Sequence, residues 1–246
     1  MKKKLIPAIL LALLAAGGLL TWHFWKPAPF AYAGTVEATE VDVPARVAST
    51  IASLAVDEGR PVTQGQLLAS LDGQDYRLAQ RLADGDYTRS LALYQSGSIP
   101  AETFQHTQIQ KQQADLKVQW CSILSPLTGV VLTKYHEPGE WVNPGTRLFT
   151  LADLSQVWCL IFVPQPDLAR LSYGMKLSAF LPELPGKAFG GEVTHINDQA
   201  EFTPKNVQTE KERTHLVYAV KVTFPNPDGL LKPGMTLEMT LPPGPK

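Results

Sequence analysis

The strongest constraint on the fold is an internal repeat, because the stretch Glu58–Leu71 recurs about eighty residues later as Pro138–Leu151. Both copies keep Gly, Val, Gly, Leu and Leu at the same spacing, without a gap. Each copy reads as short apolar strands separated by turns at glycine, which allows positive φ. The predicted turn residues are Gly59, Gly65, Gly139 and Gly145. A copy of about thirty residues is too small to bury a core alone, so the repeat predicts that two copies pack as one β-sandwich.

The segment between the two copies must leave this sandwich and return to it. Its first half carries apolar residues at helical spacing, and its second half is a more polar, glutamine-rich helix. The first stripe comprises Tyr76, Ala79, Ala83, Tyr87, Leu91 and Tyr94, and the second comprises Ile109, Leu116, Trp120 and Ile123. Gly97 just past one helix and Pro100 just inside the next indicate the turn. These signals predict an antiparallel helical hairpin over residues 73–121, whose polar surface is either solvated or in contact with a partner.

The hairpin is expected to contain one weak point. Gly85 falls in the middle of its first helix, where glycine destabilises a helix by about 1 kcal/mol relative to alanine.

The residues after Asp153 have an antiparallel β pattern. Apolar runs with strand-like alternation occur at 157–163, 177–182, 190–196, 215–224 and 234–241. We expect a small β-barrel formed by residues 30–40 and 153–241, with a long hairpin loop at 202–213 and a flexible tail at 242–246. The lipoyl-like sandwich is then formed by residues 41–72 and 122–152. The predicted fold class is mainly β with an α-helical hairpin.

The N-terminus carries three lysines, at positions 2–4, before an uncharged apolar run that begins at Leu5 and continues to Trp25. As a helix, this run would be about 30 Å long, which is enough to cross a bilayer. Residues 1–29 are therefore predicted to be a cytoplasmic stub and a single transmembrane anchor with the lysines inside. The alternative is a signal peptide cleaved after Ala31-Tyr32-Ala33. On either interpretation, the rest of the chain lies outside the cytoplasm.

The sequence gives no sign of catalytic chemistry. The net charge of -1 provides no basic field for nucleic acid. The chain has no phosphate-binding glycine loop, and its five histidines are scattered without metal-ligand spacing. We therefore predict no catalytic, cofactor-binding or metal site. Cys121 and Cys159 are interpreted as two small buried hydrophobic residues, with a disulfide as the alternative.

In this order, the elements resemble the HlyD-type periplasmic adaptors, or membrane fusion proteins, over nearly the whole chain. The resemblance is carried by the anchor, by the split halves VASTIASLAVDEGRPVTQGQLLASLD and SPLTGVVLTKYHEPGEWVNPGTRLFTLAD, by the hairpin between them, and by LSQVW, EFTPKNVQT and LKPGM in the barrel. It implies a non-enzymatic subunit without a cofactor that links an inner-membrane transporter to an outer-membrane channel for efflux or secretion. It also implies a homo-oligomeric ring, commonly hexameric, in the periplasm.

The resemblance further implies a docking tip on the hairpin. Hairpins of this family often carry an arginine, a leucine four residues later and a serine seven residues beyond that. Arg89 and Leu93 match, Pro100 replaces the serine, and Ser98 is the nearest hydroxyl that could cap the second helix instead. Because Pro100 lacks a docking hydroxyl, contact with an outer-membrane channel is left open. The short hairpin, and a chain with few residues beyond the barrel, favour an ABC-type permease as partner, with an RND-type pump as the alternative.

Two other classes of protein share part of this sequence pattern. A carrier of biotin or lipoate needs a modifiable lysine at the junction of the two halves, and the junction Leu71-Asp72-Gly73-Gln74 has none. This disfavours the carrier. A membrane-anchored scaffold or ligand-binding protein would show the same patterns as an adaptor, so only the capture of a transporter separates the two.

Overall fold

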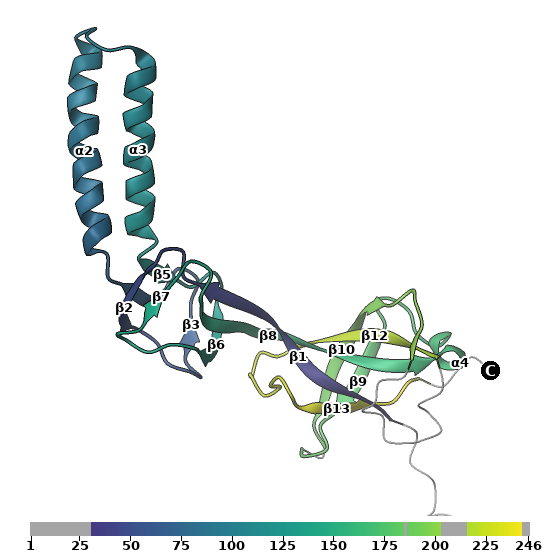
Figure 1. Ribbon diagram of the computed structural model, residues 1–246. Helices are drawn as coiled ribbons and strands as arrows, with labels where there is room; N and C mark the ends of the chain where they lie inside the picture. Colours follow the sequence, from purple (N-terminus) through teal and green to yellow (C-terminus); the bar gives the residue numbers. More distant parts are fainter. Residues whose placement is uncertain (1–30, 185, 203–215, 243–246) are drawn as a thin grey trace, which may run out of the picture.

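The computed structural model of the protein describes residues 31–184, 186–202 and 216–242. They form a β-barrel, a β-sandwich and a helical hairpin (Figure 1), which confirms the predicted mainly β fold class. The anchor predicted at residues 1–29 lies outside the described residues, as do nearly all of the loop predicted at 202–213 and of the tail predicted at 242–246. No helix within the described ranges has the length and apolar character needed to cross a membrane.

The strands of the sandwich and the helices of the hairpin come first along the chain. They are β1 (Tyr32–Pro44), β2 (Ser49–Leu54), β3 (Pro61–Val62), β4 (Leu67–Leu71), α2 (Gln74–Gln95), α3 (Ala101–Gln119), β5 (Ser122–Leu124), β6 (Gly129–Lys134) and β7 (Trp141–Val142). The remaining elements are β8 (Arg147–Pro164), α4 (Gln165–Leu168), β9 (Lys176–Phe180), β10 (Ala188–Ile196), β11 (Glu201–Phe202), β12 (Leu216–Pro225) and β13 (Thr236–Met239).

The two repeat copies interlock in the sandwich. Strand β2 of the first half pairs with β7 of the second, and β6 of the second half pairs with β3 of the first. Each half therefore completes a sheet of the other. Large apolar side chains from both halves fill the space between the sheets, among them Ile51, Leu68, Val131, Leu148 and Leu151.

The four repeat glycines lie at the crossings between the two halves. Gly59, Gly65, Gly139 and Gly145 have φ of 76°, 81°, 93° and 90°. The Gly59 amide donates to the Val131 carbonyl and the Gly139 amide to the Ile51 carbonyl, both at 2.8 Å. The Gly65 and Gly145 amides make the corresponding second pair of bonds, to Ser125 (2.8 Å) and Ala45 (2.9 Å). These bonds repeat with the spacing of the sequence repeat.

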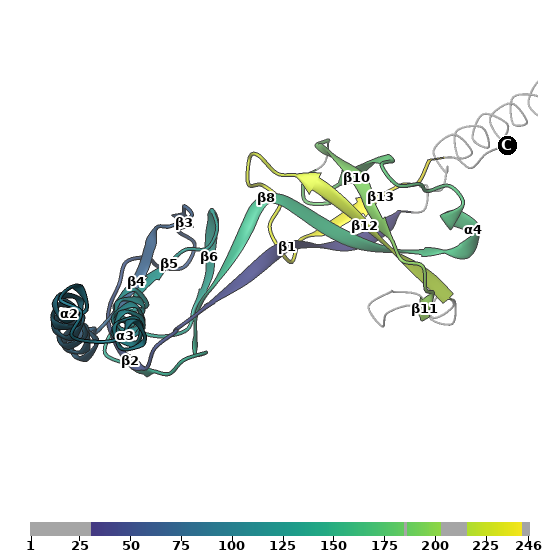
Figure 2. The same ribbon diagram turned by 90° about the horizontal axis from the view of Figure 1, so that it is seen from above.

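Strands β1 and β8 run through both the sandwich and the barrel, so the two domains share a continuous ribbon (Figures 1 and 2). The register along this ribbon shifts twice, once between Val43 and Pro44 within the sandwich and once where the ribbon passes between the domains, because Ala38 pairs with Val157 whereas Thr39 pairs with Asp153. The three residues 154–156 of β8 therefore bulge between the domains.

Asn226, which is buried, holds this bulge from the side. Its side-chain amide donates to the carbonyls of Leu154 (3.0 Å) and Leu231 (2.9 Å), and its side-chain oxygen accepts from the Leu231 amide at 3.0 Å. Its backbone amide donates to the Ser155 carbonyl at 2.9 Å. The side chain thus replaces the ladder bonds that the bulge interrupts.

The barrel follows the strand order β12-β10-β9-β13-β1-β8 and closes through pairing of β12 with β8. Its core contains fully buried apolar residues from all six strands, including Ile161, Phe224 and Leu237. Gly191 gives the Phe224 ring room, because a Cβ there would lie 2.4 Å from the ring.

The two cysteines occupy different cores. Cys121 packs in the sandwich and Cys159 in the barrel, and both thiols are free, so the alternative of a disulfide is wrong. Burial raises the pKa of Cys159 to about 12 and also raises the pKa of Cys121. Both behave as small hydrophobic residues.

The crossing glycines predict a strained substitution. Gly65→Val or Gly145→Val should lower the free energy of unfolding by about 2 kcal/mol, because positive φ is costly for a β-branched residue. Thermal unfolding of the detergent-solubilised chain, followed by tryptophan fluorescence, measures this. The matched control is Gly190→Val, since Gly190 has no positive φ and open space where a Cβ would lie. An equal loss in all three variants would contradict the turn assignment.

The bulge makes a second prediction. Asn226→Ala removes three buried side-chain hydrogen bonds and should reduce the free energy of unfolding by about 3 kcal/mol. Chemical denaturation of the same preparation measures the change. Asn143→Ala, at an exposed asparagine, should change it by less than about 0.5 kcal/mol. Similar small effects for both variants would show that Asn226 does not hold the junction.

Candidate functional site

The hairpin is the part of the chain that projects furthest from the domain cores (Figure 1). Helix α2 starts after β4 and α3 leads back into β5. At the base, the Tyr76 hydroxyl donates to the Ala48 carbonyl at 2.8 Å, and the Leu71 amide donates to the Cys121 carbonyl at 2.7 Å. The arm is therefore tied to the sandwich at its base, and its helices project away from the other elements (Figure 1).

The seam between the helices is more polar than the sequence stripes predict. The buried and half-buried positions of α2 are mostly Tyr76, Gln80, Ala83, Asp84, Tyr87, Ser90 and Leu91, and those of α3 are Phe104, Thr107, Gln108, Lys111, Ala114, Asp115 and Val118. Ala79 of the predicted first stripe is exposed, as are Ile109 and Leu116 of the second. The prediction erred because it followed apolar residues only, whereas the seam includes polar side chains that satisfy one another.

A layer of polar contacts fixes the register of the helices. The Gln80 side-chain amide donates to Asp115 at 2.7 Å, and the Lys111 ammonium lies 2.8 Å from Asp84 and 2.9 Å from Asp115. Hydrogen bonds to Asp84 and then Asp115 raise the pKa of Lys111, and bonds from Gln80 and then Lys111 lower the pKa of Asp115. The layer is therefore charged at neutral pH, and sliding one helix along the other would break it.

An aromatic cluster closes the hairpin beyond this layer. The Phe104 ring stacks on Tyr94, with centroids 5.0 Å apart and planes at 3°, and packs against Tyr87 at 5.7 Å. Aromatic pairs at such distances stabilise beyond their buried area. The tip is thus held together by apolar contacts that the middle of the seam lacks.

The turn at the tip is built on Gly97, whose φ is 74°. The Ser98 amide donates to the Leu93 carbonyl at 2.8 Å and the Gly97 amide to the Tyr94 carbonyl at 2.9 Å, which together cap α2. The Ser98 hydroxyl lies 2.9 Å from that of Ser96, and no side chain caps α3. The suggestion that Ser98 caps the second helix is therefore wrong. Pro100 stands just before α3, one residue earlier than predicted.

The four predicted docking residues are all accessible in part. Arg89 is 73% exposed, and its guanidinium bonds to Asp86 within α2. Leu93, one helical turn further along α2, is 47% exposed. Ser98 and Pro100 are exposed at the turn between the helices. The structure thus places Arg89 and Leu93 on one face of α2, with Ser98 and Pro100 beyond the end of that helix.

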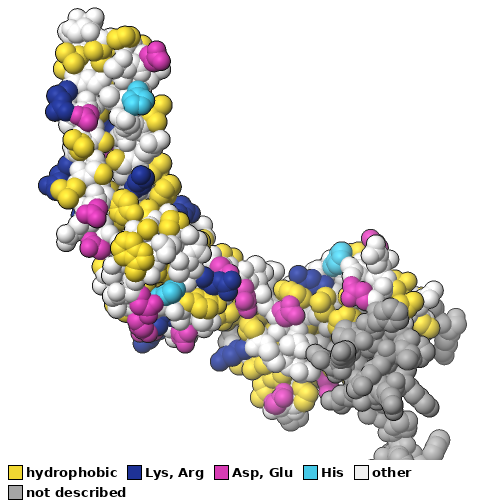
Figure 3. Space-filling view, in the orientation of Figure 1, with side chains coloured by type: hydrophobic (Ala, Val, Ile, Leu, Met, Phe, Trp, Pro, Cys, Tyr) yellow, Lys and Arg dark blue, Asp and Glu magenta, His cyan; other side chains and the backbone are white. Residues whose placement is uncertain are grey.

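The faces of the hairpin that point away from the seam carry unpartnered apolar side chains. We define the outward stripe of α2 as Leu78, Leu82, Gly85, Arg89 and Leu93, and the outward stripe of α3 as Glu102, Gln105, Ile109, Gln112 and Leu116. The spacing of three and four residues puts each set on one helical face. All five leucine and isoleucine residues are between 43% and 67% exposed, and hydrophobic side chains are visible along the length of the arm (Figure 3). Sequence reasoning missed Leu78 and Leu82, which a search for a second heptad pattern would have found.

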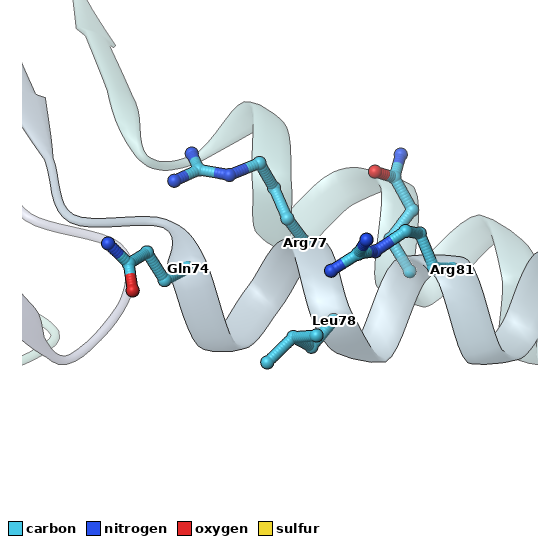
Figure 4. Close-up of a pocket in the computed structure, with 5 residues that line it drawn as sticks. Gln74, Arg77, Leu78 and Arg81 are labelled. Carbon is cyan, nitrogen blue, oxygen red and sulfur yellow. The ribbon is translucent and has the colours of Figure 1, made fainter.

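The base of α2 carries positive charge. Figure 4 shows Arg77 and Arg81 extending from the helix on either side of Leu78, over a shallow depression that Gln74 also lines. Neither arginine forms an ion pair with a described residue. The depression is an open part of the protein surface. In the described part of the chain, no group of three or more His, Cys, Asp or Glu residues is arranged to hold a metal ion.

The chain combines a sandwich and a barrel joined by shared strands with a helical arm that projects from the sandwich, an architecture without an evident catalytic centre in the described residues. Comparison with known families agrees with this architecture. Residues 39–153 match the CzcB-like barrel-sandwich hybrid domain, and residues 156–244 match the CusB-like β-barrel domain. Together the two domain models span most of the chain, and they are domains of membrane fusion proteins, or periplasmic adaptors, a family of non-enzymatic structural subunits that this chain resembles throughout.

A relative from Citrobacter koseri, a UPF0194 membrane protein, is 25% identical over 323 aligned positions that cover 98% of each chain. The alignment is longer than the 246 residues of this chain, so the relative contains stretches that this chain lacks.

Two solved structures share the fold. A chimera of MacA that carries the α-hairpin of Pseudomonas aeruginosa MexA has a TM-score of 0.71 at 19% identity, covering 87% of this chain and 81% of the chimera. The membrane fusion protein Spr0693 of Streptococcus pneumoniae has a TM-score of 0.65 at 20% identity, covering 88% and 100%.

The polar layer predicts a pH dependence. Because the pKa of Asp115 is lowered in the folded state, its stabilising effect is present above the unfolded value, about 3.9, and is lost as the pH falls through the folded value. Thermal melts followed by helical circular dichroism at pH 7 and pH 3 should show this loss. Asp115→Asn should reduce the difference between the two pH values, and the control Asp75→Asn, at an exposed residue of α2, should not. Identical pH profiles for Asp115→Asn and the unmodified chain would contradict the role of the layer.

Proposed function

We propose that this chain is a periplasmic adaptor that links an inner-membrane transporter to an outer-membrane channel for efflux or secretion. The observation that carries the proposal is the arm itself. A hairpin tied to the sandwich only at its base, with exposed apolar side chains along both helices, has a surface suited to protein contacts. In this proposal, residues 1–29 anchor the chain in the inner membrane and the rest lies in the periplasm. The HlyD-type resemblance supports the same arrangement.

The proposed assembly is a ring, with six copies as the expected number. Each hairpin has one outward stripe on α2 and another on α3. A contact between the α2 stripe of one copy and the α3 stripe of the next would be head-to-tail, and head-to-tail contacts close into rings when the rotation allows it. Sandwich and barrel would then stack around a common passage.

The favoured partner in the inner membrane is an ABC-type permease, which would supply the ATP hydrolysis that this chain has no motif for. The short hairpin, with helices of 22 and 19 residues, and the EFTPKNVQT segment support this choice. An RND-type pump is the second candidate. Cross-linking in native membranes, followed by identification of the captured protein, decides between them. Capture of neither, together with unchanged efflux and secretion on deletion, would refute the adaptor function in favour of a scaffold or ligand-binding protein.

The proposed docking tip consists of Arg89, Leu93, Ser98 and Pro100. Arginine presents a planar set of donors suited to carbonyls or carboxylates at the end of a partner helix, and Leu93 adds an apolar contact. Pro100 offers no hydroxyl, so in this chain Arg89 and Leu93 would provide the contact with an outer-membrane channel.

This assignment predicts a local effect of charge. With a photo-reactive amino acid at position 93, Arg89→Asp should reduce cross-linking to an outer-membrane protein at least fivefold while leaving the melting temperature unchanged. Arg81→Asp, on the same helix near the base, should leave that cross-link unaltered. If Arg89→Asp has no effect, Arg89 is a solvated surface charge.

A further inference from the structure

Gly85 is a glycine that the chain itself does not require. It does not have positive φ, and a Cβ at this position would meet no atom of the chain within 4 Å. Glycine in a helix interior lowers helix stability relative to alanine, so Gly85 weakens α2 without an internal benefit. The general reason for glycine on a helix surface is the close approach of another backbone or of a large side chain.

Two exposed leucines, Leu78 and Leu82, lie on the same face of α2 as Gly85, toward its base. Gly85 lies on the outward stripe of α2, three residues after Leu82 and four before Arg89, and Leu78 lies one further turn toward the base. Leu78 is 56% exposed and Leu82 is 67% exposed. The Arg89 guanidinium is already paired with Asp86, whereas Arg81, four residues before Gly85, forms no ion pair with a described residue, so a partner on this face must leave the Arg81 guanidinium in contact with water. Gly85 thus forms a gap on this face, with Leu82 on the side of the base and Arg89 on the side of the tip.

The helix register shows which residues lie at the same height on the other helix. Gln80 contacts Asp115 and Asp84 contacts Lys111. Each residue later in the sequence of α2 is therefore level with a residue one position earlier in α3. By this register Gly85 is level with Gln110, and Ile109 is about 1.5 Å away along the axis. Leu78 is level with Lys117, and Leu116 is again one residue away. The outward stripe of α3 therefore presents its two apolar residues at the heights of Gly85 and Leu78.

A rotation about an axis parallel to the hairpin keeps every residue at its own height. In a head-to-tail ring with such an axis, α2 of one copy faces α3 of the next. Ile109 then meets Gly85, and Leu116 meets Leu78.

We propose that Gly85 is the socket for Ile109 of a neighbouring copy, and that the outward stripes of α2 and α3, on the base side of the docking residues Arg89 and Leu93, form the contact between hairpins of adjacent protomers. This inference rests on the proposed adaptor function for its ring. It goes beyond that function by assigning the residues in contact, their pairing and the antiparallel arrangement of the two helices.

Paired cysteines test the contact. The double variant Gly85→Cys with Ile109→Cys should form intermolecular disulfides in native membranes, giving a ladder of oligomers that ends at a closed ring. Within one chain the two positions are separated by the hairpin, with Cα atoms more than about 10 Å apart, too far for a disulfide, which needs about 4.4–6.8 Å. Leu78→Cys with Leu116→Cys should give the same ladder.

A mismatched pair is the control. Gly85→Cys with Leu116→Cys differs in height by about 10 Å and should cross-link at least tenfold less. The unmodified chain supplies the background, because its two cysteines are buried.

A size series at the socket separates contact from folding. A Cβ at position 85 would meet no atom within 4 Å, and leucine is a better helix former than glycine, so Gly85→Leu should leave the helical signal and melting temperature of the solubilised monomer equal or higher. It should also reduce formation of the ring at least tenfold, and Gly85→Ala should reduce it less. A fall in the melting temperature of the monomer with Gly85→Leu would overturn the proposal, because Gly85 would then be needed inside the chain.

The remaining outcomes are distinct. Dimers from Gly85→Cys alone would indicate a two-fold contact between α2 helices and overturn the pairing. Cross-links from position 85 to a different protein would assign the face to the transporter or channel. Equal ladders from matched and mismatched pairs would refute the register. If matched pairs fail while position 93 still captures a partner, the contact is refuted and the adaptor function stands. A ladder without any captured transporter supports the contact and counts against the adaptor function.

Discussion

The exchange of backbone hydrogen bonds between the two halves of the sandwich is the constraint on which the rest of the structure depends. Gly59 and Gly139 donate to Val131 and Ile51, and Gly65 and Gly145 donate to Ser125 and Ala45. Neither half has a complete sheet alone, so the halves must meet even though some fifty residues separate them. Those residues must therefore extend away from the sandwich and return to it, and they do so as the helical hairpin.

The same constraint sets the position of the barrel. Strands β1 and β8 enter the sandwich from the barrel as one ribbon, so the two domains cannot separate without breaking strand pairing. The bulge held by Asn226 lies where that ribbon passes between the two domains. A stiff base with a projecting arm is a suitable form for a subunit that spans a gap between membranes, because the arm reaches its partners from a defined position.

Much of the architecture could be predicted from the sequence because it depends on periodic signals. The repeat indicates the sandwich, the turn residues Gly97 and Pro100 indicate the hairpin, and strand alternation after Asp153 indicates the barrel. The seam of the hairpin was predicted less well, since Gln80, Lys111 and Asp115 belong to it through polar contacts that an apolar pattern does not include. The exposed Leu78 and Leu82 were missed for the related reason that an outward apolar residue has no partner within the chain. The bulge at 154–156 and its contact with Asn226 depend on residues distant in sequence, and no local signal indicates them.

In the proposed function, the chain acts as one of several copies joined to a transporter. Native mass spectrometry of the full chain, extracted from its own membrane in mild detergent, tests this most directly. The expected result is a particle that contains six copies together with the subunits of an inner-membrane transporter. A particle that contains one copy and no transporter subunit, under conditions that preserve other membrane complexes in the same sample, would contradict it.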